Sequence, residues 1–155
     1  MKVFGTIYRY WVTLVWLAVV VQIMFAAYGG FYAADKLGDQ KGSDETKHIS
    51  EKVFDHGFDF HTGFGYTIFL GSVLLFLIAL ATRLGRRRVL LALAVPVAVA
   101  VQIVLAWISE DVPGVGFLHG LNALVIFGLT GSMTGAAWRQ HRASRAAQTP
   151  SAVPT

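Results

Sequence analysis

The sequence predicts an all-α integral membrane protein, a four-helix bundle made of two parallel two-helix repeats with both termini in the cytoplasm. Three observations predict it: long stretches without charge, the sidedness of the basic residues, and a repeated pattern of polar residues. The chain has 155 residues, of which 55% are hydrophobic and 14% are charged. A soluble domain usually carries about a quarter of charged residues. The composition therefore excludes an ordinary soluble or disordered chain.

Four charge-free stretches give the helices. They lie between Arg9 and Asp35, Asp59 and Arg83, Arg88 and Glu110, and Asp111 and Arg139. Each reaches the roughly 20 residues that a helix needs to cross the hydrocarbon core. The predicted spans are 10–34, 57–82, 89–109 and 115–138 within a membrane domain 1–142, with an extracytoplasmic loop 35–56 and a flexible cytoplasmic tail 143–155. The first span is longer than the apolar core of a cleavable signal, about 7–15 residues, so we expect it to be retained.

The charges give the orientation. The two ends of the chain and the second connection carry nine basic residues and no acidic one: Lys2, Arg9, Arg83, Arg86, Arg87, Arg88, Arg139, Arg142 and Arg145. All nine carboxylates lie in the first and third connections. Because basic connections stay in the cytoplasm, both termini are predicted inside and the acidic connections outside. The same sidedness explains the pI of about 9.6 without a nucleic-acid partner.

Polar residues recur inside the apolar helices. Residues 19–26 (VVVQIMFA) recur at 99–106 (VAVQIVLA), and residues 61–69 (HTGFGYTIF) recur at 119–127 (HGLNALVIF). The offsets are 80 and 58, so the first unit has the longer connection. Apolar residues match easily by chance, whereas one Gln and one His at the same points do not. We therefore predict two parallel units related by a pseudo-two-fold axis along the membrane normal.

The two histidines are candidate metal ligands. His61 lies roughly 33 Å of helix before Arg83, and His119 roughly 30 Å before Arg139, so both lie at similar depth near the outer boundary. If the second and fourth helices face each other, the imidazoles converge as an axial pair for a haem iron. Neighbouring small residues leave room for a macrocycle: Ala26, Gly29, Gly30, Gly57, Gly63, Gly65, Ala106, Gly120 and Ala123.

Each of these features also has a simpler interpretation. A histidine at the end of a span is often an interfacial polar residue, and small residues permit close helix packing. Gln22 and Gln102 are expected first of all to bond neighbouring helices, with cofactor binding or the orientation of an axial imidazole as a second role. His56, with Asp55 and Asp59, is interpreted as a polar helix start rather than a metal site.

The order of Gln22, His61, Gln102 and His119 resembles one four-helix half of the haem A synthase family, over residues 15–130. The resemblance implies haem ligation by His61 and His119. The chain departs from the family in having Thr62 where an Arg usually follows the first His, and in lacking a second half, the loop cysteines and the acidic residue three positions before that His. The family's haem-oxidising activity is therefore not implied.

Residues Leu118-His119-Gly-Leu-Asn122-Ala123 also resemble a pattern in small four-span membrane proteins of actinobacteria, which implies a bacterial inner membrane. The leading hypothesis is a membrane-embedded haem-b-binding protein with bis-His ligation near the outer face, serving electron transfer or haem handling. The alternatives are a non-catalytic accessory subunit of a larger membrane complex without cofactor, and an enzyme acting on quinone or haem. The expected partners are the lipid bilayer together with a redox partner, a larger complex or further copies of the chain, and not nucleic acid.

Overall fold

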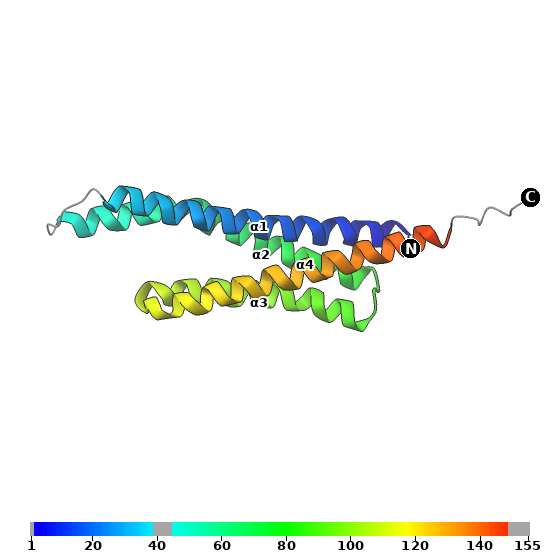
Figure 1. Ribbon diagram of the computed structural model, residues 1–155. Helices are drawn as coiled ribbons and strands as arrows, with labels where there is room; N and C mark the ends of the chain where they lie inside the picture. Colours follow the sequence, from blue (N-terminus) through cyan, green and yellow to red (C-terminus); the bar gives the residue numbers. More distant parts are fainter. Residues whose placement is uncertain (1, 39–44, 149–155) are drawn as a thin grey trace, which may run out of the picture.

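The computed structural model describes residues 2–38 and 45–148, which form four α-helices and one short 3-10 helix (Figure 1). The helices are α1 (Lys2–Gly38), α2 (Glu45–Ala81), α3 (Arg86–Asp111) and α4 (Gly116–Ala146), and the 3-10 helix η1 (Pro113–Val115) precedes α4. The predicted all-α, four-helix architecture is confirmed. Four helical segments of the described chain are long and apolar enough to cross a membrane: Gly5–Lys36 in α1, Lys52–Ala81 in α2, Arg86–Asp111 in α3, and Pro113–Ala146, which joins η1 to α4.

The four helices form a ring. The backbone of α1 lies close to α2 and α4, and that of α3 lies close to α2 and α4. The backbones of the diagonal pairs, α1–α3 and α2–α4, do not come this close over the described residues. The α1–α2 hairpin extends beyond the turn between α3 and α4, and the N-terminus and the C-terminal end of α4 lie together at the opposite end (Figure 1).

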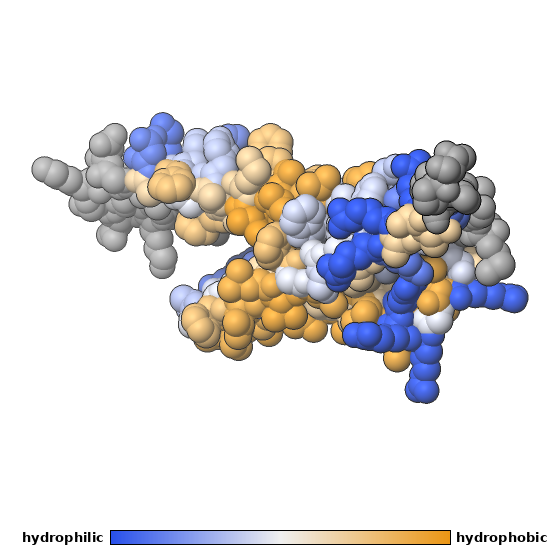
Figure 2. Space-filling model, turned by 45° about the vertical axis from the view of Figure 1, so that its right-hand side comes forward, coloured by the Kyte–Doolittle hydropathy of each residue, from blue (hydrophilic) through white to orange (hydrophobic). Residues whose placement is uncertain are grey.

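Large apolar side chains face outward along all four helices. Leu14, Phe31, Leu70, Phe117 and Leu124 are among those more than half exposed. Figure 2 shows hydrophobic residues over the middle of the visible face and hydrophilic residues gathered toward its two ends. A helix that is apolar on every side suits the interior of a large protein or a bilayer rather than water.

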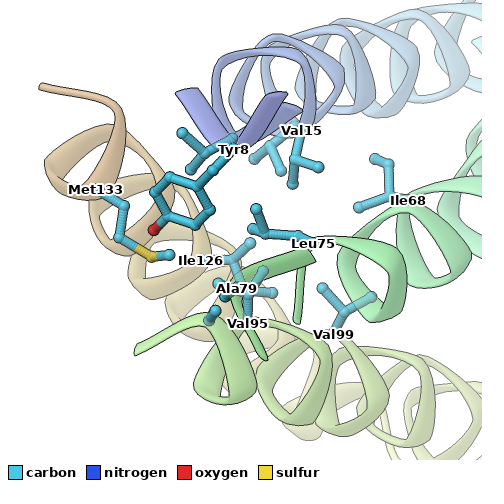
Figure 3. Close-up of a cluster of buried hydrophobic side chains, with 12 residues drawn as sticks. Tyr8, Val15, Ile68, Leu75, Ala79, Val95, Val99, Ile126 and Met133 are labelled. Atoms are coloured by element: carbon cyan, nitrogen blue, oxygen red, sulfur yellow. The ribbon is translucent and has the colours of Figure 1, made fainter. Parts of the chain in front are cut away.

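The buried core consists largely of positions that the offsets of 80 and 58 relate (Figure 3). Related buried pairs are Val12 and Ala92, Val15 and Val95, Val19 and Val99, Ile68 and Ile126, Ser72 and Thr130, and Leu75 and Met133. The hydroxyls of Ser72 and Thr130 each donate to a carbonyl of their own helix, at Phe69 and Ile126, at 2.7 Å. Intrahelical bonds of this kind satisfy a buried hydroxyl without an interhelical partner.

The helices are longer than predicted. The prediction of a loop over 35–56 is wrong for most of that range, because α1 continues to Gly38 and α2 begins at Glu45. The flexible tail was likewise placed too early, since α4 continues to Ala146, and residues 149–155 lie outside the described residues. Hydropathy marks where an apolar run ends, whereas a helix continues into water as long as its backbone bonds and its helix–helix contacts persist.

Candidate functional site

A cavity of about 350 Å³ lies between the α1–α2 and α3–α4 hairpins and is lined by all four helices. All its lining residues except Trp107 occur in pairs related by the two offsets: Val19 and Val99, Gln22 and Gln102, Ile23 and Ile103, Ala26 and Ala106, His61 and His119, Thr62 and Gly120, Gly65 and Ala123, Tyr66 and Leu124, and Ile68 and Ile126. All four predicted site residues therefore line one cavity. Apart from these four, its walls are mostly apolar.

Each glutamine is joined to one histidine by two hydrogen bonds. In the first hairpin, Gln22 Nε2 donates to the carbonyl oxygen of His61 at 2.7 Å, and His61 Nδ1 lies 3.2 Å from the carbonyl oxygen of Gln22. The second hairpin has the same pair of bonds, with Gln102 Nε2 2.9 Å from the carbonyl oxygen of His119, and His119 Nδ1 3.1 Å from that of Gln102. The glutamines thus make the expected interhelical bonds, and their backbones orient the imidazoles.

These bonds determine the tautomer of both histidines. A carbonyl oxygen only accepts hydrogen bonds, so Nδ1 must carry the proton in His61 and in His119. Nε2 of a neutral imidazole then has a free lone pair. A histidine that binds a metal through Nε2 commonly donates Nδ1–H to a backbone carbonyl or a carboxylate in this way.

The two imidazoles lie next to each other across the bundle. Their ring centroids are 6.2 Å apart and their planes meet at 55°. The rings thus meet across the diagonal α2–α4, where the backbones make no contact over the described residues. With metal–imidazole bonds of about 2 Å and the ring radius added, two rings on opposite sides of one metal have centroids roughly 6 Å apart. The separation fits a single metal atom held by both.

Only two protein ligands are present at this position. The described part of the chain contains no group of three or more His, Cys, Asp or Glu side chains arranged to hold a metal ion. A bare zinc ion would need four ligands. An iron inside a macrocycle needs only two axial ligands from the protein, because the ring supplies the other four donors. The donor set therefore fits haem better than a free ion.

The two halves of the site differ at one polar contact. Asn122 Nδ2 lies 2.7 Å from Gln102 Oε1 and 2.9 Å from the carbonyl oxygen of Ala98. At offset 58 from Asn122 stands Phe64, and Gln22 Oε1 is buried without a hydrogen-bond partner in the described structure. Sequence reasoning missed this role of Asn122, although its position three residues after His119 places both side chains on one face of α4.

Seven of the nine predicted small residues have one of two roles. Gly65, Gly120, Ala26, Ala106 and Ala123 line the cavity as expected. The expectation that Gly29 and Gly57 make room for a macrocycle is wrong: a Cβ built at Gly29 would lie 2.8 Å from the carbonyl oxygen of Gly57. These two glycines allow α1 and α2 to approach closely, which is the packing role of small residues.

His56 belongs to no metal site among the described residues. Its Nδ1 lies 3.7 Å from Asp59 Oδ2, and both side chains are 70% exposed. The ring also lies against Tyr32, at 5.5 Å between centroids. These contacts agree with the interpretation of His56 as a polar residue in the first part of α2.

Comparisons with known proteins add no relative. No protein-family model, no curated protein and no solved structure matches the chain.

Proposed function

We propose that this chain is a membrane-embedded haem-b-binding protein in which His61 and His119 are the axial ligands of one iron. The observation that carries the proposal is the pair of imidazoles, 6.2 Å apart, each with its Nδ1 bonded to a backbone carbonyl. Both Nε2 lone pairs are thereby free for a metal. Neither a surface histidine nor one that only caps a helix requires a fixed tautomer or a second imidazole beside it.

The cavity around the imidazoles supports a flat apolar ligand. Its volume of about 350 Å³ lies within the range of small-molecule sites, about 300–1,000 Å³. Gly65 and Gly120 line it, so the helix backbones border the cavity at those positions. Gly120 also has nothing within 4 Å of a built Cβ, which leaves open space next to His119 in the cavity wall.

We further propose that all four helices cross the bacterial inner membrane with both termini in the cytoplasm. The charge sorting supports it, since the arginines of the α2–α3 connection and of the C-terminal part of α4 belong to the same end of the bundle as the N-terminus (Figure 1). The cavity then lies toward the outer face. The pairing of cavity and core positions by the offsets of 80 and 58 supports two parallel two-helix repeats.

The haem would supply one-electron cycling between Fe(III) and Fe(II), suited to electron transfer or haem handling. The protein contributes the rest. His61 and His119 would hold the metal from α2 and α4, Gln22 and Gln102 keep both rings in the required tautomer, and the mostly apolar lining faces the ring of the cofactor.

The visible spectrum of the protein purified from cells supplied with haem tests the proposal. We expect a six-coordinate low-spin spectrum for the native protein, a five-coordinate one for His61→Ala or His119→Ala, and no bound haem in the double variant. His56→Ala is the matched control, because His56 lies on α2 and outside the cavity, and it should keep the native spectrum. Native protein without absorbance, or full haem content in the double variant, would refute ligation by these residues and favour an accessory subunit without cofactor.

A further inference from the structure

The contact between Asn122 and Gln102 makes the two histidine sites unequal. Gln102 is held at both ends of its amide: Nε2 bonds the carbonyl of His119, and Oε1 accepts from Asn122 at 2.7 Å. Asn122 is itself fixed by its bond to the carbonyl oxygen of Ala98. The carbonyl that orients the His119 ring thus belongs to a residue whose side chain is bonded to α4 at two points.

Gln22 is held at one end only. Its Nε2 bonds the carbonyl of His61, but its Oε1 is buried without a partner in the described structure. Phe64, which stands in the place of Asn122, offers no hydrogen-bond donor. Its ring packs instead against Phe25, with centroids 5.4 Å apart. Because Gln22 Oε1 gains a partner only if its amide moves, the Gln22–His61 pair opens more easily than the Gln102–His119 pair.

Building on the proposed haem ligation, we propose that His119 is the permanent axial ligand and His61 the exchangeable one, which opens a binding site for a small uncharged iron ligand on the His61 side. With haem bound, His61 Nε2 would give up its place on the iron to the incoming molecule, one bond replacing the other with no change in oxidation state. His61 leaves as a neutral imidazole and keeps its Nδ1 proton. Gln22 lines the cavity on this side.

The first test measures carbon monoxide binding to the dithionite-reduced, haem-loaded protein. Phe64→Asn places an amide donor at the position equivalent to Asn122, and we expect it to slow binding about tenfold, because one added hydrogen bond then holds the His61 side. Phe64→Leu is the matched control: it removes the same ring but adds no donor, so binding should stay at the native rate or rise. Equal rates for Phe64→Asn and Phe64→Leu would overturn the proposal.

The second test needs no haem. Nitrogen-15 NMR of labelled histidine in the haem-free protein distinguishes the two tautomers of each ring. We expect His119 almost wholly protonated at Nδ1, and His61 mainly so but with a larger fraction protonated at Nε2; Asn122→Leu should raise that fraction at His119 to a similar level. Identical tautomer populations at both rings in the native protein would overturn the inequality. A chain that binds no haem would refute the proposed function instead, and the NMR comparison separates the two failures.

Discussion

The reciprocal bonds between each glutamine and histidine have two effects: they satisfy a polar side chain inside the bundle, and they orient an imidazole. A polar side chain among apolar helices costs free energy unless it is hydrogen-bonded, and the amides of Gln22 and Gln102 are bonded to the neighbouring helix. The same contact brings the glutamine backbone carbonyl against the histidine Nδ1 and thereby orients the imidazole. Helix association and ring orientation therefore depend on the same residues.

Replacement of either glutamine by leucine, which preserves volume, tests this dependence. Gln22→Leu removes one side-chain bond and a buried oxygen that already lacks a partner, so we expect a loss of about 0.5–1.5 kcal/mol in the free energy of unfolding. Gln102→Leu also removes the acceptor of Asn122, so it should cost about 1–3 kcal/mol. Unfolding of the purified protein in mixed detergent micelles measures both. A larger loss for Gln22→Leu would contradict the observed difference between the two amides.

At the scale of the helices, one close contact keeps the α1–α2 hairpin together beyond the cavity. A Cβ at Gly29 would lie 2.8 Å from the carbonyl oxygen of Gly57 and 2.9 Å from the Phe58 ring. Close approach of this kind gives dispersion contact between helix backbones, the main attraction available between helices in lipid. The hairpin therefore continues as two paired helices where the sequence had indicated a loop.

Gly29→Ala should separate α1 from α2 at this point. We expect a destabilisation of about 1–3 kcal/mol, the usual cost of overpacking. Gly30→Ala is the matched control on the same helix, because nothing lies within 4 Å of its Cβ. It should be neutral or stabilising by up to about 1 kcal/mol, since alanine is the better helix former. The thermal midpoints of the two variants provide the comparison, and equal midpoints would show that the close contact contributes nothing.

At the scale of the whole molecule, the chain is suited to cysteine mapping because it contains no cysteine. Lys52→Cys, in α2, and Arg87→Cys, at the start of α3, each introduce one exposed thiol, near opposite ends of the bundle. With both termini in the cytoplasm, a membrane-impermeant maleimide should label Lys52→Cys in intact cells and Arg87→Cys only after permeabilisation. The reverse pattern would invert the proposed orientation. Labelling of both thiols in intact cells would show that the helices do not separate two compartments as proposed.

The sequence predicted the number and type of helices and the nearness of four polar residues, because charge gaps and polar positions inside apolar runs are visible without a structure. Gln22, His61, Gln102 and His119 do line a common cavity. The helix ends were predicted less well, since the charged residues near Asp35 and Asp55 continue the helices instead of ending them.

Other features could not be read from composition. Gly29 and Gly57 were assigned to the macrocycle because spacing alone does not show which neighbour a small residue faces. The contact of Asn122 with Gln102 depends on the packing of α4 against α3. The first half of the described structure has no such contact, because Phe64 stands at the position equivalent to Asn122. Small differences between otherwise related halves are the hardest to find, because repeat matching draws attention to what is shared.

The paired lining of the cavity has a consequence for any ligand that lacks the same symmetry. Haem b has an axis in the plane of its ring that passes midway between the two propionates, and its vinyl and methyl groups are not symmetric about this axis. A half-turn about the axis therefore gives a distinguishable complex with the same two histidine ligands. The described walls differ between the two orientations at the unpaired Trp107 and at unlike pairs such as Tyr66 with Leu124 and Thr62 with Gly120. Unless they discriminate by more than about 1.4 kcal/mol, which is a tenfold preference, both orientational isomers coexist at equilibrium. Spectra of the loaded protein would then contain two sets of haem signals from a chemically homogeneous sample.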